Sequence, residues 1–301
     1  MKILFMGTPE FAKVSLEYLV NDNNDNFEVL GVVTQPDKPA GRKMILTPPP
    51  VKECALAANI PVYQPQSVKG DDFFEFLKII GPDIIAVVAY GKILPRFVLE
   101  YPKYGCVNVH ASLLPKYRGT SPIVAAIAGG EKTTGITTIF MDEGIDTGDM
   151  ILKEAIEIGE NETHGELHDR LAKLGGELLL STLVRIQNGT AERQKQPEEG
   201  TSYTKKIDET LCEIDQSKTA KEVHDKIRSL SPSPTAFMRL EGKKLKIYKS
   251  EILESDARES VLDIVCKGGI VRILEVQPEG KKRMSAKDFL NGRKASDIIK
   301  T

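Results

Sequence analysis

An asparagine and a histidine lie two positions apart at the end of a short apolar run. The stretch 105–115 reads GCVNVHASLLP, and its cysteine and valines predict a buried strand whose pairing stops by Pro115. Positions two apart on a strand project from the same face, so Asn108 and His110 would lie side by side. They offer an amide donor and a group that titrates near neutrality. Strand ends of this kind carry the chemistry of α/β enzymes, although hydrogen bonds into the neighbouring loop would explain the same pair.

An acidic cluster follows a second apolar run. Residues 136–140 predict a strand, and residues 141–149 read MDEGIDTGD directly after it. The glycines at 144 and 148 would let this loop bend back sharply. An acid such as Asp146, delivered beside His110, would orient the ring and favour its charged form. Alone, the cluster could equally be a solvated acidic turn or a weak cation site.

Strand-like and helix-like runs alternate along the first part of the chain. The pattern predicts an α/β fold, with a Rossmann-like, mostly parallel sheet and helices on both faces. The first turn, after a strand over 2–6, contains Gly7 and Thr8 but no GxGxxG, which argues against a dinucleotide cradle and a dehydrogenase. We expect Thr8 to cap the following helix. The predicted strands are 2–6, 27–33, 61–63, 83–89, 105–110, 136–140 and 150–158, and the predicted helices are 11–18, 51–58, 72–80, 122–128 and 163–186.

Length and charge predict a second domain. A chain of 301 residues exceeds the usual single domain. We expect a catalytic domain over 1–188, a polar linker over 189–205, and a small β-barrel over 206–301, built from a helix and short strands. Residues 1–201 hold 20 basic and 27 acidic side chains, whereas residues 202–301 hold 21 and 16. A basic second domain suggests a polyanionic partner, although such an excess also occurs on ordinary solvated surfaces.

Other sequence features exclude several classes of protein. No apolar run approaches the roughly 20 residues of a membrane span, and the opening MKILF predicts a strand rather than a signal peptide. The four cysteines lie far apart, which fits a reducing cytoplasm. His164 and His168 are one helical turn apart, but HGELH lacks the HExxH pattern and a third ligand, so we expect no metal site. We interpret both, and His224, as surface or interdomain histidines.

A proline-rich stretch at 34–50 predicts a long loop. Five prolines and one glycine in 17 residues exclude a regular element. Loops of this length inside compact domains are usually functional, although a plain surface connection remains an alternative. Arg42 and Lys43 lie near its middle.

The patterns Asn-x-His-x-Ser-Leu-Leu-Pro at 108–115 and Asp-x-Gly-x-Asp-Thr-Gly at 142–148 resemble those of the 10-formyltetrahydrofolate-dependent formyltransferases. The resemblance implies a Rossmann-like catalytic domain followed by an OB-like barrel. It also implies 10-formyltetrahydrofolate as co-substrate, no metal, and Asn108, His110 and Asp146 as catalytic residues. The residues that it implies for folate binding are Ser112, Leu113, Leu114, Pro115, Ala89, Tyr90 and Gly91.

The resemblance covers essentially the whole chain and is closest to the members that act on methionyl-tRNA. Residues 35–42 (QPDKPAGR) match the loop with which those members reach the tRNA acceptor stem, which implies that Arg42 and Lys43 contact tRNA. It also implies a tRNA-binding barrel. The chain departs from the family after Arg42, where Lys43-Met44-Ile45 replaces Gly-Lys-Lys. This replacement reduces the positive charge of the loop. The chain has no tryptophan, so we expect a repacked barrel.

The resemblance implies acyl transfer to an amine. A neutral amine would attack the formyl carbon, Asn108 would stabilise the oxyanion, and His110 and Asp146 would handle the proton and the charge. By the resemblance the acceptor is initiator methionyl-tRNA, in translation initiation, and the enzyme is a cytoplasmic monomer. The alternatives are an amine of a sugar nucleotide or of glycinamide ribonucleotide as acceptor, or a non-catalytic folate- or RNA-binding protein. The loop and the basic barrel favour tRNA, and the complete catalytic set favours an enzyme.

Overall fold

The chain folds into two compact units. The computed structural model describes residues 1–22, 26–41, 44–240, 242–253 and 262–291. The first unit comprises residues 1–119, 135–156 and 169–203, and the second comprises residues 120–134, 157–168 and the chain from 204 on. Two segments that precede residue 169 therefore contribute to the second unit.

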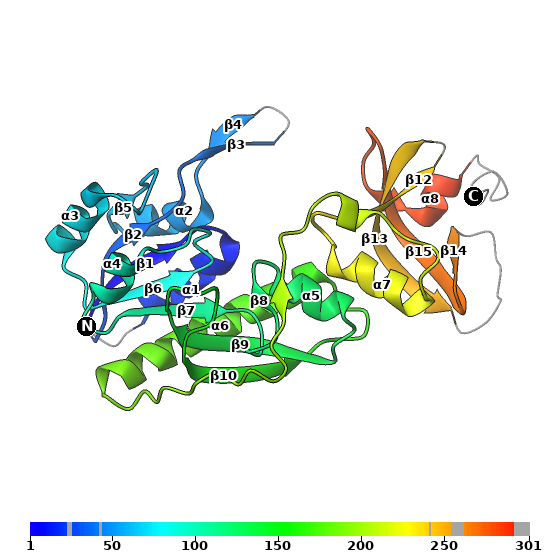
Figure 1. The fold of residues 1–301 in the computed structure, drawn as a ribbon. Coiled ribbons are helices and arrows are strands. Elements are labelled where there is room, and N and C mark those ends of the chain that lie inside the picture. The colour runs from blue at the N-terminus through cyan, green and yellow to red at the C-terminus, as the bar shows by residue number, and fades with distance from the viewer. Residues whose placement is uncertain (23–25, 42–43, 241, 254–261, 292–301) are drawn as a thin grey trace. The chain divides into compact units, whose positions relative to one another are not determined.

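The first unit is organised around one sheet of seven strands, in the order β10-β9-β7-β6-β1-β2-β5 (Figure 1). The neighbours from β5 to β7 pair in parallel, and β9 runs antiparallel to β7. The mostly parallel sheet expected from the sequence is thus confirmed. The strands are β1 Lys2–Gly7, β2 Glu28–Val33, β5 Val62–Tyr63, β6 Ile84–Val88, β7 Cys106–His110, β9 Thr133–Phe140 and β10 Met150–Glu157.

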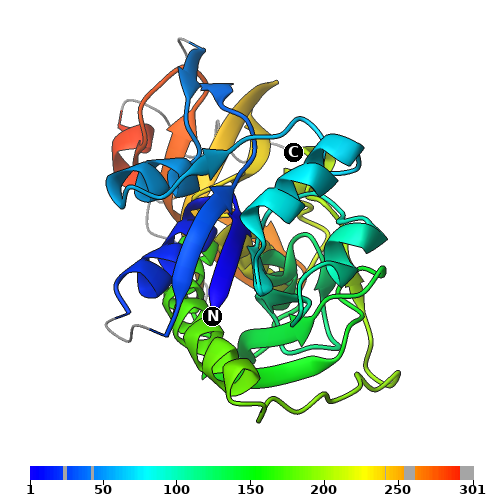
Figure 2. The same ribbon diagram turned by 90° about the vertical axis from the view of Figure 1, so that its left-hand side faces the viewer.

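Helices cover both faces of this sheet (Figure 2). On one face lie α1 (Glu10–Val20), α2 (Pro50–Ala57) and, from residue 169 on, α6 (His164–Gln187). On the other face α3 (Asp71–Ile80) and α4 (Arg96–Glu100) pack on apolar side chains of β1, β2, β6 and β7. The α6 helix approaches the sheet closely at Gly175, where an added Cβ would lie 3.1 Å from a methyl group of Val109. The central strands are buried on both sides, which explains their continuous apolar runs.

The expected loop at 34–50 contains a short hairpin, so the exclusion of a regular element was wrong. Strands β3 (Lys38–Ala40) and β4 (Ile45–Thr47) pair antiparallel, and the hairpin extends away from the sheet (Figure 1). Pro39 is tolerated because each strand of an isolated pair has one edge that needs no partner. The prolines at 48–50 lie beyond the hairpin and lead into α2. Arg42 and Lys43 lie outside the described residues.

The second unit is a small β domain with helices packed on it, as the sequence predicts. Among its described residues, five strands form an antiparallel sheet, and two register shifts in β13 bend the long β13–β15 pair. The α7 helix begins with a capping box between Thr219 and Glu222. Val223 and Ile227 of α7 share one core with Val124 of α5. The elements are β12 Ala236–Leu240, β13 Lys243–Leu253, β14 Asp263–Cys266, β15 Gly269–Pro278, β16 Met284–Ser285, α5 Pro122–Ala128, α7 Ala220–Ser229 and α8 Ala286–Leu290.

His224 is buried in the second unit, so its interpretation as a surface or interdomain residue was wrong. Its side chain lies on the inner face of α7, only 3% exposed, with Nδ1 2.9 Å from Ser250 Oγ. Burial, and then the neighbouring Arg228 guanidinium, hold the pKa of His224 below its ordinary value of 6.5. Asp225 pairs with Arg228 on the same helix, with 2.8 Å between carboxylate and guanidinium.

Three further observations concern the chain as a whole. All four cysteines are free thiols. Within the described ranges, no helix combines the length and apolarity needed to cross a membrane. Those ranges likewise contain no group of three or more His, Cys, Asp or Glu side chains placed to hold a metal ion.

Candidate active site

The β7 strand carries both polar side chains singled out from the sequence. It lies between β6 and β9, with Asn108 opposite Val87 on one side and Ile139 on the other. Asn108 is half-buried and His110 is 5% exposed. Both side chains reach the same carboxylate, that of Asp146, as two positions on one face of a strand can.

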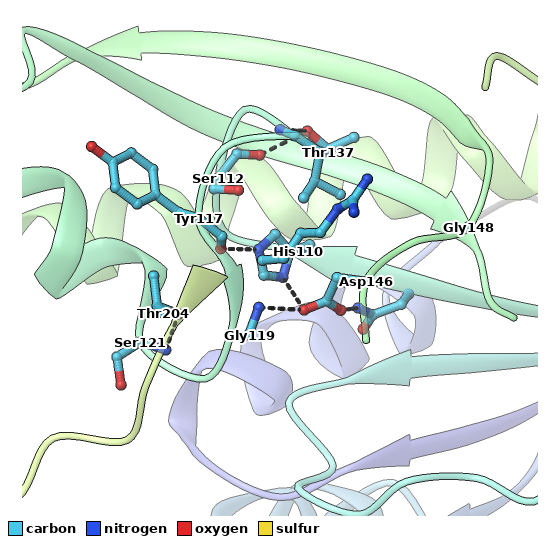
Figure 3. A network of polar contacts seen from close by, with 12 residues as sticks. His110, Ser112, Tyr117, Gly119, Ser121, Thr137, Asp146, Gly148 and Thr204 are labelled. Atoms are coloured by element: carbon cyan, nitrogen blue, oxygen red, sulfur yellow. Dashed lines mark hydrogen bonds and ion pairs between the residues drawn. The ribbon is translucent and has the colours of Figure 1, made fainter. Parts of the chain in front are cut away.

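The Asp146 carboxylate is held by two side chains of β7 and by the backbone N–H of Gly119. Figure 3 shows His110 and Gly119 beside it. Oδ1 accepts a hydrogen bond from Asn108 Nδ2 at 3.3 Å. Oδ2 accepts a hydrogen bond from the Gly119 backbone N–H at 2.8 Å and lies 3.4 Å from His110 Nδ1. The Asp146 side chain is 17% exposed, so part of it remains accessible.

Both ring nitrogens of His110 face oxygen atoms. Nε2 lies 2.9 Å from the Tyr117 carbonyl oxygen, and Nδ1 faces the Asp146 carboxylate. A carbonyl oxygen only accepts, so Nε2 donates to it, and an ionised carboxylate also only accepts. A ring with hydrogens on both nitrogens therefore satisfies both neighbours, and His110 can place positive charge beside Asp146.

The loop that carries Asp146 is tightly packed. Asp146 adopts φ +53°, a left-handed conformation that is strained for a residue other than glycine. A Cβ at Gly148 would lie 1.7 Å from the Phe140 carbonyl oxygen, and one at Gly144 would lie 1.9 Å from Thr147 Oγ1. These glycines are therefore required for close approach, whereas the sequence suggested only a sharp bend.

This loop is supported by two residues that the sequence analysis did not identify. The Gln196 amide donates to the backbone oxygens of Asp146 and Gly148, both at 2.8 Å. Its Oε1 accepts from Nε and Nη2 of Arg118, at 3.0 and 2.8 Å. Gln196 lies in the stretch interpreted as a linker. Arg118 and Gly119 lie outside the predicted helices and strands, and they form the short strand β8 (Arg118–Gly119). Neither periodicity nor a motif marks these positions.

The turn predicted to bind folate, Ser112 to Pro115, follows β7 directly. Ser112 Oγ donates to the Lys116 carbonyl oxygen at 2.6 Å, and the Ser112 carbonyl oxygen accepts from Thr137 Oγ1 at 2.7 Å. Leu114 is fully buried against Ile139 and Met150. The side chains of Leu113 and Pro115 are half-buried, so they keep surface that a ligand could cover.

The second predicted folate segment, Ala89 to Gly91, follows β6. Ala89 and Gly91 are exposed and have positive φ, +46° and +82°. The Tyr90 side chain is 2% exposed, burial raises its pKa to about 12, and its hydroxyl has no partner among the described residues. The β1–β6 pair is where the strand order reverses, which is where open α/β sheets bind ligands.

Thr8 does not cap the first helix, so that expectation was wrong. The N-cap of α1 is Pro9, and no side chain bonds to the helix end there. Thr8 Oγ1 instead donates to the Tyr90 carbonyl oxygen at 3.3 Å, and Gln35 Nε2 donates to the same oxygen at 3.2 Å. The two hydrogen bonds tie the ends of β1 and β2 to the turn after β6.

The residues predicted to contact tRNA are only partly described. Met44, Ile45 and Leu46, which follow Arg42 and Lys43, are exposed at the end of the β3–β4 hairpin. Lys281 and Lys282, two basic side chains of the second unit, are also exposed.

Comparisons with known proteins give matches that cover both units and agree with one another. Residues 1–183 match the family described as "Formyl transferase", and residues 206–294 match "Formyl transferase, C-terminal domain". The methionyl-tRNA formyltransferase of Acetivibrio thermocellus is 46% identical, over 99% of this chain and 98% of that protein. The methionyl-tRNA formyltransferase of Clostridioides difficile is 45% identical, over 97% of each.

Solved structures show the same fold. A sugar 3N-formyl transferase, crystallised with dTDP and 5-N-formyl-THF, gives a TM-score of 0.68 at 22% identity, over 94% of this chain and 99% of that one. A methionyl-tRNA formyltransferase from Clostridium thermocellum gives 0.60 at 20% identity, over 92% and 98%. At these identities the likeness concerns the fold alone.

Proposed function

We propose a reaction for this chain from one premise: the chain belongs to the family of methionyl-tRNA formyltransferases, enzymes of formyl transfer. The reaction moves the formyl group of 10-formyltetrahydrofolate to the free amino group of initiator methionyl-tRNA. The observation that carries the proposal is the Asp146 carboxylate, which lies within reach of both Asn108 and His110 at the carboxyl end of β7. These are the groups that acyl transfer to an amine requires.

Asn108 is suited to stabilise the oxyanion. When the neutral amine forms its bond to the formyl carbon, the carbonyl π electrons move to the oxygen. One amide hydrogen of Asn108 bonds to Asp146, and the other has no partner in the described part of the chain. That second hydrogen can donate to the developing oxyanion. Loss of one such donor typically lowers the rate by about 10²–10³.

Asp146 is the group best placed to take the proton. The attacking nitrogen becomes cationic and must lose a proton, while N10 of the folate gains one as its bond to the formyl carbon breaks. Both nitrogens of His110 already face oxygen atoms, whereas among the described residues Asp146 Oδ1 accepts only the long bond from Asn108. We therefore assign the proton transfer to Asp146 and the charge compensation to His110. This route needs neither a metal ion nor a covalent enzyme intermediate.

Two turns at neighbouring strand ends would hold the folate. We assign the pterin to the turn of Ser112, Leu113, Leu114 and Pro115 after β7 and to the turn of Ala89, Tyr90 and Gly91 after β6. Because Leu114 is buried in the core, Leu113, Pro115 and the backbone would supply the contact surface after β7. A flat pterin fits a surface that combines apolar side chains with a few polar backbone groups.

The tRNA would contact both parts of the chain. We propose a catalytic part over 1–188, a linker over 189–205 and a tRNA-binding part over 206–301. Arg42 and Lys43 would contact the acceptor stem, and exposed lysines such as Lys281 and Lys282 would contact phosphates. We further propose that the enzyme acts as a monomer in the cytoplasm, where translation initiation takes place.

The acceptor can be tested directly. The purified chain is incubated with 10-formyltetrahydrofolate labelled in the formyl group and with one acceptor at a time. The acceptors are methionine-charged initiator tRNA, an amino-sugar nucleotide and glycinamide ribonucleotide, with uncharged tRNA as the control that lacks the amine. We expect label on charged tRNA alone. Transfer to a small amine would favour one of the other acceptors, and binding without transfer would favour a non-catalytic protein.

A further inference from the structure

A segment after α6 returns to the active site and contacts the Asp146 loop and the residues that flank it. We call residues 189–203 the strap and residues 141–149 the Asp146 loop. The Gln194 and Met150 backbones exchange two hydrogen bonds, of 2.8 and 2.9 Å. The Arg193 guanidinium lies 3.7 Å from the centre of the Phe140 ring and 3.7 Å from an Asp149 carboxylate oxygen. The strap therefore holds the Asp146 loop near both of its ends.

We propose that Gln196 of the strap is a positioning residue for formyl transfer, which acts by fixing the backbone of Asp146. This inference rests on the proposed function, since it concerns the same reaction. Gln196 is the strap residue whose side chain reaches the middle of the Asp146 loop, where it donates to the carbonyl oxygens of Asp146 and Gly148, both at 2.8 Å. It does not touch the carboxylate, so any effect on the reaction passes through the conformation of the loop.

Arg118 determines which way the Gln196 amide points. The guanidinium of Arg118, which is 9% exposed, donates twice to Gln196 Oε1, at 3.0 and 2.8 Å. A flipped amide would place NH₂ against the guanidinium donors and oxygen against two carbonyl oxygens, so it would lose four hydrogen bonds. The Tyr203 hydroxyl, also on the strap, accepts from Arg118 Nη1 at 3.0 Å.

The Asp146 loop needs the hydrogen bonds from the Gln196 amide for two physical reasons. Asp146 is held at φ +53°, a strained conformation that persists only where the surroundings impose it. The carbonyl oxygens of residues 146 and 148 converge on one point, where they would repel each other without a shared donor. With the amide between them, the Asp146 side chain stays within reach of Asn108, His110 and Gly119.

Two substitutions separate this role from mere anchoring of the strap. Gln196→Leu removes both donors and the acceptor. Gln196→Glu keeps the acceptor for Arg118, with a charge that strengthens the pair, but turns an oxygen toward the two carbonyl oxygens. If Gln196 only secures Arg118 and the strap, Gln196→Glu retains activity. If Gln196 positions Asp146, both variants lose it.

The experiment is steady-state formylation of charged initiator tRNA by wild type and the two variants, with Gln194→Leu as the matched control. Gln194 lies two positions away on the strap, with its side chain exposed. We expect kcat to fall about 10- to 100-fold in both Gln196 variants, because small misplacements of a reacting group cost up to that much. The KM values for tRNA and folate should change by less than about threefold, and Gln194→Leu should match wild type.

Folding is followed by the midpoint of thermal unfolding, and every assay is run well below that midpoint. A Gln196→Glu variant with kcat within about threefold of wild type would overturn the proposal, as would a loss confined to KM. If wild type and Gln194→Leu formylate the tRNA, the proposed function stands whatever the Gln196 variants do. If neither transfers the formyl group, the proposed function itself fails.

Discussion

Replacement of Asp146 by asparagine removes one charge and keeps the shape of the side chain. In the structure Oδ2 accepts from the Gly119 N–H at 2.8 Å and faces His110 Nδ1 at 3.4 Å, while Oδ1 accepts from Asn108 at 3.3 Å. An asparagine has only one oxygen, so its NH₂ group must face either Asn108 or the pair of Gly119 and His110. Either orientation places one donor against another.

The expected loss has two parts. The variant lacks the base that we assign to proton transfer, which corresponds to a fall in kcat of about 10²–10⁴. It also loses hydrogen bonds to a charged group, which should lower the free energy of unfolding by about 1–3 kcal/mol. The KM for tRNA should change little, because the carboxylate is assigned to the transition state rather than to tRNA binding.

The assay is single-turnover formylation with saturating enzyme, with thermal unfolding measured in parallel. Asp142→Asn is the matched control, because Asp142 is an exposed acid of the same loop that accepts only local bonds, from the Gly144 N–H at 3.0 Å and Thr147 Oγ1 at 2.6 Å. An asparagine oxygen can accept both, so this control should retain wild-type rates. The assignment of Asp146 as the base is refuted if Asp146→Asn keeps more than about a tenth of the wild-type rate.

Three further results are expected. Leu113→Ala should raise the Kd for 10-formyltetrahydrofolate about fivefold, measured by calorimetry, and leave tRNA affinity unchanged, because about 1 kcal/mol of apolar contact is lost. Replacement of Lys281 and Lys282 by glutamine should lower the affinity for all tRNAs about equally and make binding depend less on salt. In contrast, Arg42→Ala should reduce discrimination between initiator and elongator tRNAs. The pKa of buried His224 is lowered, so below pH 6.5 the unfolded chain takes up a proton that the folded chain does not. The melting temperature should therefore fall as the pH is lowered below 6.5. It should fall less in His224→Gln. An equal fall in the two proteins would exclude His224 as the cause.

The sequence predicted the parts of the site that depend on periodicity and local motif. The spacing of Asn108 and His110 on an apolar strand places both on one face, and the strand register bears this out. The Asp146 loop was singled out as an acidic cluster directly after a predicted strand, and its pattern also resembles that of a known family. The structure brings the Asp146 carboxylate to both side chains.

The contacts that position Asp146 could not be predicted. Gln196 is 50 residues from Asp146 in the sequence, and its neighbours are polar and lack any period. Gly119 contributes only a backbone N–H, which any residue type could supply. Such contacts arise from the path of the chain in space. For the stretch that contains Gln196, composition suggested only a linker.

Two local expectations failed because tertiary packing outweighed the local pattern. Five prolines suggested an irregular loop at 34–50, but a two-stranded hairpin tolerates proline at its free edges. His224 was interpreted as a surface or interdomain residue, yet its helix packs against β13 and encloses the ring beside Ser250. Burial of a polar side chain is decided by the elements around it, which a single helix pattern does not specify.

The central claim is that Asn108 stabilises the oxyanion formed when the amino group of methionyl-tRNA attacks the formyl group. The most direct measurement is the single-turnover rate of formylation by Asn108→Ala, with tRNA and folate binding measured on the same protein. We predict a rate about 10²–10³ below wild type, with both dissociation constants unchanged within about threefold. A rate within tenfold of wild type, or a loss explained entirely by weaker binding, would contradict the claim.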